Sequence, residues 1–455
     1  MGQVANSGIA GEAGTAAMRE RAGAAGASQT DAGGTALNVG VVVDLFWEPE
    51  AGGHVKCWER FAEAAVGEPG LDLTIYFLGE KREVITLAPN VRYMTRRPLL
   101  DTNKIWFLDK MPDHTDLAPF HPRFVRHWRR LHVLHTTDAY FTLARTAMRY
   151  ARMSGKPLVN SIHTDTPRYT RVYSKRALER LFGGGPWGRW ITNTAHLHER
   201  MGAMMQRKLD RYVRRCDWVL GNDIEETELE RSAIPTERYS VLRRGIDKEA
   251  FHPAKRDRMR LRYRFGIPED RFVMLFAGRL DPDKSVMTAA RAARALLERG
   301  VPIHALFAGD GSQRREVEAL LGSNATLTGA VPQNELAWLY ASSDLFVFPS
   351  RNEISPNVVV EAKASGLAIV VSAEGGSSRF VREHAEDGVV LDDHDAAHWA
   401  DEIGVLYLDA ERRVEMGRRA RQSVEAEWPS WRDVLRRDLV PVWRNVAEKR
   451  GVWRA

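Results

Sequence analysis

Residues 349–372 read PSRNEISPNVVVEAKASGLAIVVS and contain two glutamates, Glu353 and Glu361, with seven residues between them. The apolar run 345–348, LFVF, precedes this stretch and predicts a buried strand. The run 369–371, IVV, begins a second strand near its end. A strand, a short apolar segment and another strand in this order predict a unit of an α/β fold.

The segment between the two strands has the start and stop signals of a helix. Ser355 and Pro356 predict an N-cap followed by proline at the first helical position. Gly366 is placed to end the helix. Glu353 then lies on the loop before the helix, and Glu361 lies about one and a half turns into it.

This layout suits a nucleotide sugar. The free N–H groups and the positive dipole end of a helix N-terminus favour a diphosphate. Glu361 can accept both hydroxyls of a ribose, and Glu353 would face whatever lies beyond the phosphates. The alternative is that the two glutamates only complement the helix dipole. Val360 and Ala362 flank Glu361 in an apolar helix, however, and a buried carboxylate needs a partner or a function.

The C-terminal half resembles the retaining glycosyltransferases of the GT-B fold, family 4, also called glycosyl transferases group 1. Besides the two-glutamate segment, the matching stretches are VLRRGIDKEAFHP (241–253), FAGRLDPDKS (276–285), LFAGDGS (306–312), LTGAVPQNELAWLYASSDLFVFPS (327–350) and GGSSRFVREHAEDGVVL (375–391). The N-terminal half agrees more loosely through NVGVVVDLFWEPEAGGHVKCWERFA (38–62), GKPLVNSIHTD (155–165) and RRCDWVLGND (214–223).

Length and composition agree with a large α/β protein. The chain has 455 residues and is 44% hydrophobic, so two or more domains are expected. Strand-like runs alternate with amphipathic segments over residues 38–450, which predicts parallel sheets. No apolar run is long enough to predict a membrane-spanning helix. Cys57 and Cys216 are the only cysteines, which favours a reduced, cytoplasmic protein.

The resemblance implies two Rossmann-like domains that face each other across a cleft. We expect an acceptor-binding domain at 37–240 and a nucleotide-sugar-binding domain at 241–428. Residues 429–455 would form a helix that crosses back to the first domain. Residues 1–36 are rich in small residues and predict a disordered tail. The final helix has one apolar stripe, made of Trp431, Leu435, Leu439, Val442, Trp443 and Val446.

The second domain supplies most of the implied site. Arg279 and Lys284 would neutralise a diphosphate and then the charge of the leaving group. Gly278 would leave space for the phosphate. The resemblance places Gly309 beside the nucleotide and Gly329 where the base is bound.

Family resemblance also assigns roles around the two glutamates. Glu353 is implied as a catalytic residue and Glu361 as a donor-binding one. Ser355 and Asn357 are implied to contact the substrate. Ile354-Ser355-Pro356 replaces a sequence of aromatic–glycine type, so the donor sugar stays open.

The first domain contributes fewer predicted site residues. Gly52 and Gly53 form a loop after the first strand, and the resemblance implies that this loop closes over donor and acceptor. His163 follows a strand and is implied to contact the transferred sugar. Asp165 either binds acceptor hydroxyls or caps a turn.

Neither a metal nor a cofactor is expected. The segment 281–283, DPD, has the spacing of a metal-binding DxD motif, but it lies in the loop where cations already serve the phosphate. The segment 392–395, DDHD, looks like a ligand cluster, but it follows a strand and is expected to begin the next helix.

The chain is basic, with a net charge of +6. No nucleic-acid-binding motif is present, so nucleic acid is not an expected partner. Residues 119–134 and 171–190 interleave arginines with aromatic residues, which suggests contact with an anionic membrane surface. The equally weighted alternative is that the aromatic residues are core and the arginines form a solvated face.

The predicted function is transfer of a sugar, with retention, from a UDP- or GDP-sugar to an acceptor hydroxyl. A lipid or lipid-linked glycan of the cell envelope is the favoured acceptor, at the inner face of the membrane. The alternatives are a phosphorylase or epimerase of the same fold, or a non-catalytic sugar-binding protein.

Overall fold

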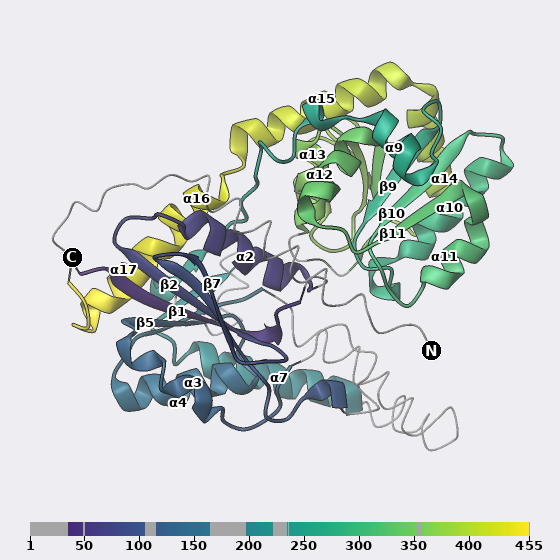
Figure 1. Cartoon of the computed structure of the whole chain (residues 1–455). Coiled ribbons are helices and arrows are strands. Elements are labelled where there is room, and N and C mark those ends of the chain that lie inside the picture. The colour runs from purple at the N-terminus through teal and green to yellow at the C-terminus, as the bar shows by residue number, and fades with distance from the viewer. Residues whose placement is uncertain are drawn as a thin grey trace. The chain divides into compact units, whose positions relative to one another are not determined.

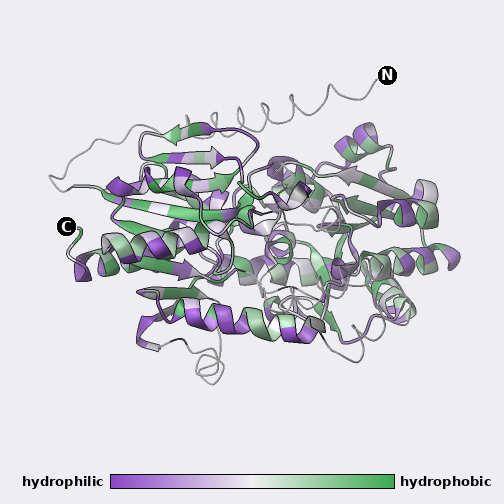
Figure 2. Cartoon of the chain, turned by 90° about the horizontal axis from the view of Figure 1, so that it is seen from below, coloured by the Kyte–Doolittle hydropathy of each residue, from purple (hydrophilic) through white to green (hydrophobic). Residues whose placement is uncertain are grey.

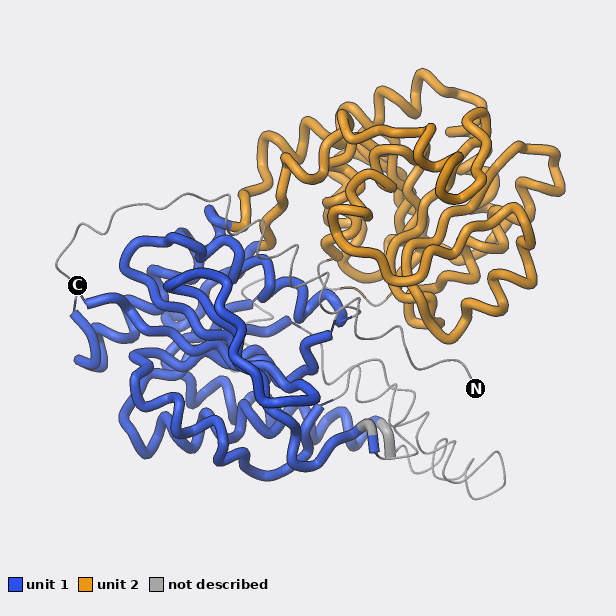
Figure 3. Tube along the Cα trace, viewed as in Figure 1, with its two compact units in different colours: residues 1–243, 432–455 blue, residues 244–431 orange. Residues whose placement is uncertain are grey.

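The computed structural model describes residues 35–48, 51–104, 115–163, 197–221, 234, 236–351, 353 and 356–454. The chain divides into two compact units (Figure 3). The first consists of Met1–Arg243 and Arg432–Ala455, and the second is Arg244–Trp431. Only the last two residues of the predicted tail, 1–36, are among the described residues.

The first unit is built on a sheet whose described strands run in the order β3-β4-β2-β1-β5-β6-β7-β8. All neighbours are parallel except β3 and β4. The strands are β1 (Leu37–Phe46), β2 (Leu71–Leu78), β3 (Glu83–Ala88), β4 (Val91–Arg96), β5 (Val133–Thr136), β6 (Leu158–Ser161), β7 (Trp218–Gly221) and β8 (Tyr239–Val241).

Helices cover both faces of this sheet (Figure 1). On one face lie α2 (Gly53–Ala65) and the C-terminal helices, and on the other lie α3 (Pro122–Val125), α4 (Thr142–Ser154) and α7 (Leu197–Val213). The strands are mostly hydrophobic and the helices alternate hydrophobic with hydrophilic residues (Figure 2). This pattern is expected of a parallel sheet covered on both sides.

The C-terminal segment packs within the first unit. It consists of α16 (Trp431–Val434), a π-helical turn (Leu435–Leu439) and α17 (Val440–Lys449). The predicted apolar stripe is buried along its whole length. Pro441 has no N–H to donate to the preceding turn, which accounts for the wider turn before α17. Trp443 Nε1 lies 3.1 Å from His135 Nδ1, and Asp438 pairs with Arg243 at 2.6 Å.

The second unit has a parallel sheet with the described order β11-β10-β9-β12-β13-β14. The strands are β9 (Phe272–Ala277), β10 (Ile303–Ala308), β11 (Ala325–Gly329), β12 (Leu345–Phe348), β13 (Ala368–Ser372) and β14 (Val389–Leu391). The helices are α9 (Arg258–Phe265), α10 (Val286–Glu298), α11 (Arg314–Leu321), α12 (Gln333–Ser342), α13 (Asn357–Ala364), α14 (Ala396–Leu408) and α15 (Ala410–Glu427). Figure 1 shows α10, α11 and α14 on one face and α12 and α13 on the other.

The strand–helix–strand prediction for residues 345–372 is confirmed, with one shift. The helix begins at Asn357, so Pro356 flanks the helix and does not occupy its first position. Gly366 follows the helix with φ of +75°, as a terminating glycine does. A second difference lies at Gly329, which ends β11 itself and does not follow that strand.

Of the two equally weighted interpretations of 119–134, burial of Phe124 and Trp128 fits the one in which aromatic residues belong to the core. Phe124 and Trp128 are fully buried, with their rings 5.8 and 6.1 Å from that of Tyr76. Their large apolar area favours the core, and the interleaved arginines are left exposed. Residues 171–190, the other predicted contact, lie outside the described residues. Among the described helices, none is long and apolar enough to span a bilayer.

Two buried carboxyl groups meet beyond the carboxyl end of β5. Asp44 of β1 accepts hydrogen bonds from the backbone N–H groups of Leu143 and Ala144, at 2.8 and 2.7 Å. Asp138 likewise accepts two backbone N–H groups. Burial raises the pKa of both carboxyl groups, and the charge of Asp138 raises that of Asp44 further. We infer that the pair shares one proton.

Asp138→Asn is expected to make the stability of the protein less sensitive to rising pH. The pKa values of both groups lie above the ordinary 3.8 in the folded chain. The pair is therefore most favourable below that pH, and stability declines as pH rises through the folded-state values. An asparagine amide can donate to Asp44 and has no proton to lose. Each kcal/mol of unfolding free energy that the variant retains at high pH, relative to wild type, should raise its Tm by about 2–4 °C.

Thermal unfolding followed by circular dichroism at about pH 5 and about pH 8 measures this effect. The exposed Asp270 provides a matched control, Asp270→Asn. If wild type and both variants lose the same Tm between the two pH values, the shared proton is ruled out.

Candidate active site

The loops that follow β9 and β10 are packed against each other at the carboxyl edge of the second sheet. Gly278 N donates to the carbonyl oxygen of Ala308 at 2.9 Å. Gly309 has φ of +150°, and a Cβ there would lie 1.9 Å from the carbonyl oxygen of Gly278. The close approach of the Gly278 backbone is therefore enough to require glycine at position 309, whether or not a nucleotide binds beside it.

Lys284 and Glu353 meet at this edge although they are far apart in sequence. Lys284 Nζ lies 2.5 Å from Glu353 Oε1, and Ser350 Oγ donates to the same oxygen at 3.1 Å. The two charged side chains are only 13% and 16% exposed. The predicted catalytic lysine and glutamate thus form an ion pair that is shielded from solvent. A diphosphate that binds Lys284 would compete with Glu353 for its ammonium group.

Arg279 is also paired, with the two carboxylates of the DPD segment. Its guanidinium lies 3.2 Å from Asp283 and 3.7 Å from Asp281. Asp281 also accepts hydrogen bonds from Ser312, through N at 2.9 Å and Oγ at 2.7 Å. Both carboxylates of the DxD spacing are therefore bound to groups of the protein.

Glu361 is held from a neighbouring helix. Its carboxylate is 7% exposed. It accepts hydrogen bonds from Gln333 Nε2 at 3.2 Å and from the Tyr340 hydroxyl at 3.4 Å, both on α12. Burial, and then the charge of Glu361, raise the pKa of Tyr340 well above its ordinary value, so the hydroxyl stays protonated and donates. These neutral donors orient the carboxylate without adding a positive charge.

A glycine pair supports the loop that carries Glu353. The carbonyl oxygen of Glu353 accepts from Gly376 N at 2.7 Å. Gly375 has φ of +77°, and a Cβ there would come within 2.8 Å of the carbonyl oxygen of Arg351. Asn357 is half-buried at the first position of α13. Ser355 lies outside the described residues.

The remaining turns of the second unit have structural explanations. Asp310 accepts a hydrogen bond from Gly311 N at 2.7 Å and so stabilises its turn. Gly329 has φ of +72° and open space around its Cβ position. Asp395 caps α14, as expected for the DDHD segment, and Asp393 pairs with His398 at 2.6 Å.

In the first unit, His163 lies just beyond β6 and is almost buried. Its Nε2 is 2.7 Å from Ser161 Oγ, and its ring stacks on that of His54 with centroids 4.5 Å apart. Gly52 flanks α2 and Gly53 is its first residue. A Cβ at Gly53 would meet no atom within 4 Å, so local packing does not demand glycine there. Asp165 lies outside the described residues.

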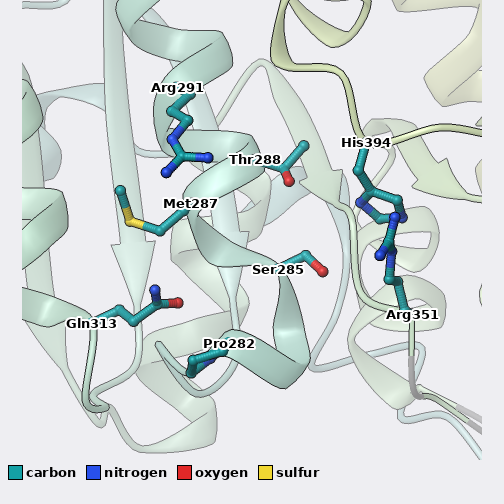
Figure 4. A pocket seen from close by; sticks show the side chains of 8 residues that line it. All are labelled: Pro282, Ser285, Met287, Thr288, Arg291, Gln313, Arg351 and His394. Atoms are coloured by element: carbon teal, nitrogen blue, oxygen red, sulfur yellow. The ribbon is translucent and has the colours of Figure 1, made fainter. Parts of the chain in front are cut away.

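A small pocket of about 240 Å³ opens at the start of α10 (Figure 4). Arg291, Arg351 and His394 are among its lining side chains. Burial, and then the charge of Arg351, lower the pKa of His394. Ligand pockets usually measure about 300–1,000 Å³, so this one is too small for a nucleotide sugar. Among the predicted site residues that the structure describes, none lines it.

Sequence reasoning assigned no role to Ser350, Gln333, Tyr340 and Gly376, and it considered Asp283 only as part of the DPD segment. All five lie within the stretches of family resemblance, which was the only available signal. The contacts of Gln333 and Tyr340 with Glu361 could not be predicted, because α12 meets α13 only through the fold.

Comparison with known proteins finds related sequences and structures. The family described as glycosyl transferases group 1 matches residues 257–423. The chain is 36% identical over 237 residues to a D-inositol 3-phosphate glycosyltransferase of Salinispora tropica, covering 48% of each protein. It is 28% identical over 292 residues to the sulfoquinovosyl transferase SQD2 of Arabidopsis thaliana, covering 63% of this chain and 51% of that protein. The chain thus spans about half the length of the curated relatives it matches.

Solved structures share the whole fold. HepE of Anabaena, solved with UDP and glucose, covers 91% of this chain and 99% of its own, with a TM-score of 0.61 and 16% identity. Sucrose-phosphate synthase of Thermosynechococcus elongatus covers 91% and 98%, with a TM-score of 0.63 and 18% identity. The chain therefore has the GT-B fold, and residues 257–423 of its second domain match the glycosyl transferases group 1 family.

Proposed function

We propose that the protein is a retaining glycosyltransferase of family 4, which moves a sugar from a UDP- or GDP-sugar to an acceptor hydroxyl. The proposal rests on the Lys284–Glu353 ion pair, which is shielded from solvent. The loop that carries Glu353 leads into α13, the helix that contains Glu361. A surface ion pair has no need of such burial, whereas a catalytic site benefits from charges held in a low dielectric.

Each charged group has a proposed role. The buried Glu361 carboxylate, which Gln333 and Tyr340 orient by hydrogen bonds, accepts the ribose hydroxyls. Lys284 and Arg279 bind the diphosphate, and the N-terminus of α13 adds N–H donors. Glu353 then faces the sugar. Its carboxylate replaces part of its interaction with Lys284 by a hydrogen bond that it accepts from a sugar hydroxyl.

The proposed chemistry occurs on one face of the sugar. The bond between the anomeric carbon and the diphosphate oxygen breaks, and the acceptor oxygen bonds to that carbon from the same side. The leaving phosphate oxygen takes the acceptor proton. Lys284 and Arg279 stabilise the charge that develops on the diphosphate, so no metal is required in this proposal.

Acceptor identity is proposed only as a class. The relatives are named for D-inositol 3-phosphate glycosyl transfer and for sulfoquinovosyl transfer, and the first name fits a polar, negatively charged acceptor. A lipid or lipid-linked glycan is the other proposed class. Arg123, Arg126, Arg129 and Arg130 are exposed, which suits electrostatic contact with anionic lipid at the inner face of the membrane. Such contact would not include insertion of the buried aromatic residues.

Thermal shift with a panel of UDP- and GDP-sugars tests the donor part of this proposal. We expect one donor type to raise the Tm of the full chain, because a ligand that binds only the folded state stabilises it. A concentration of about 100 times Kd should contribute about 2.7 kcal/mol. Glucose 1-phosphate, which lacks the nucleoside, serves as the matched control ligand. No shift with any nucleotide sugar would remove the proposed donor site.

A further inference from the structure

The first unit contains a buried arginine at the carboxyl end of β4. Arg96 is the last residue of that strand and is 3% exposed. Its Nη1 donates to the carbonyl oxygen of Thr95 at 3.0 Å, and its Nη2 lies 2.9 Å from Nε2 of His127. The Nε of Arg96 is buried and has no hydrogen-bond partner in the structure. A buried cation therefore retains an unused donor, which is uncommon in folded proteins.

The charged groups around Arg96 are cations. Burial lowers the pKa of Arg96, and the positive charges of Arg82, Arg126 and Arg123 lower it further. His127 accepts hydrogen bonds at Nε2 from Arg96 and, at 3.2 Å, from Nε of Arg126. Burial and the charges of these arginines also lower the pKa of His127. The ring is therefore a neutral acceptor and supplies no negative charge.

Two acidic residues of neighbouring segments, Glu83 and Asp116, are engaged elsewhere. Glu83, at the start of β3, pairs with Lys81 at 3.4 Å. Asp116 accepts the backbone N–H groups of Leu99 and Leu100, both at 2.9 Å. Within the part of the chain that the structure describes, none of the four arginines forms an ion pair. The cluster therefore has an uncompensated positive charge.

We propose that Arg96 and Arg126 bind a phosphate group, with Arg82 and Arg123 at the rim of the site. Guanidinium groups offer parallel N–H donors that match the oxygens of a phosphate. A phosphate dianion supplies the negative charge that the buried Arg96 lacks. Arg82, Arg123 and Arg126 are exposed, so the cluster reaches the surface.

A solvated basic face does not account for this cluster. Arg129, on the turn that follows, is exposed and fits a solvated face. Arg96 differs because its guanidinium is removed from water and faces other cations. A soluble phosphorylated molecule and a lipid head group both present the same phosphate oxygens, and the experiment below separates the two sources. The site is independent of the proposed glycosyl transfer and can be tested by binding alone.

Calorimetric titration of the full chain with inorganic phosphate at low ionic strength tests the site. We expect a Kd on the order of 1 mM or below for wild type. Arg126→Gln should weaken binding by about tenfold or more, because a charge-assisted hydrogen bond is lost. Arg129→Gln removes the same charge from the same segment and should change Kd by less than about twofold. Arg96→Lys keeps the positive charge and loses the parallel N–H donors of the guanidinium group. It should therefore weaken phosphate binding as Arg126→Gln does.

A second arm uses flotation with phosphatidylcholine vesicles, with and without phosphatidic acid. Phosphate binding without flotation supports a soluble phosphorylated ligand. Flotation that depends on phosphatidic acid and is competed by inorganic phosphate supports a lipid head group. The proposal is overturned if neither form of phosphate binds, if excess phosphate fails to compete, or if Arg129→Gln weakens binding as much as Arg126→Gln.

Discussion

Lys284→Met is expected to lower kcat by about 100-fold or more, with a smaller change in KM for the donor. The negative charge on the leaving diphosphate grows in the transition state, so the ammonium group contributes most there. Lys284 is only 13% exposed, and its charge is therefore weakly screened by solvent. Steady-state kinetics with the donor identified by thermal shift measures the effect. Methionine keeps most of the length of the side chain and removes its charge, which limits loss of packing.

Lys255→Met is the matched control, because Lys255 is exposed in the same unit. It should leave kcat unchanged. The double variant Lys284→Met with Glu353→Gln should lose little more than Lys284→Met alone, since the two side chains act as a pair. A Lys284→Met enzyme with wild-type kcat and a raised KM would instead show that the lysine only binds the donor.

Glu361→Gln is expected to weaken donor binding by about tenfold to a hundredfold. A hydrogen bond to a charged group is worth about 1.5–3 kcal/mol, and the ribose hydroxyls would lose a charged acceptor. Glutamine has the same shape and can still bond to Gln333 and Tyr340, so the fold should survive. Calorimetric Kd for the donor nucleotide measures the loss.

Tyr340→Phe separates charge from positioning at this site. It removes one donor to Glu361 and keeps the carboxylate, so donor affinity should fall by less than in Glu361→Gln. Equal Kd values for wild type and a folded Glu361→Gln variant would show that the ribose lies elsewhere.

Local sequence signals were enough for the elements that carry the site. The run 345–348 is β12 with the predicted bounds, because four apolar residues closed by Pro349 leave little choice for a buried strand. The helix start was displaced by one residue, since a proline next to a helix fits either the cap or the first turn. The C-terminal stripe of residues 431–446 was readable from helical spacing.

Contacts between distant segments could not be predicted in the same way. Lys284 and Glu353 were each assigned to substrate, and their pairing depends on how two strands of one sheet align. The burial of Phe124 and Trp128 depends on Tyr76, which belongs to another strand. Arg96 carried no local signal, because its neighbours in sequence do not reveal the cations that surround it.

Release of nucleoside diphosphate from a panel of UDP- and GDP-sugars, with phosphorylated polyols and lipid extracts as acceptors, tests the central claim most directly. We expect acceptor-dependent release from one donor type, in wild type and in Lys255→Met. The release should be nearly lost in Lys284→Met. A folded protein that releases no nucleoside diphosphate from any donor, or a Lys284→Met variant as active as wild type, would contradict it.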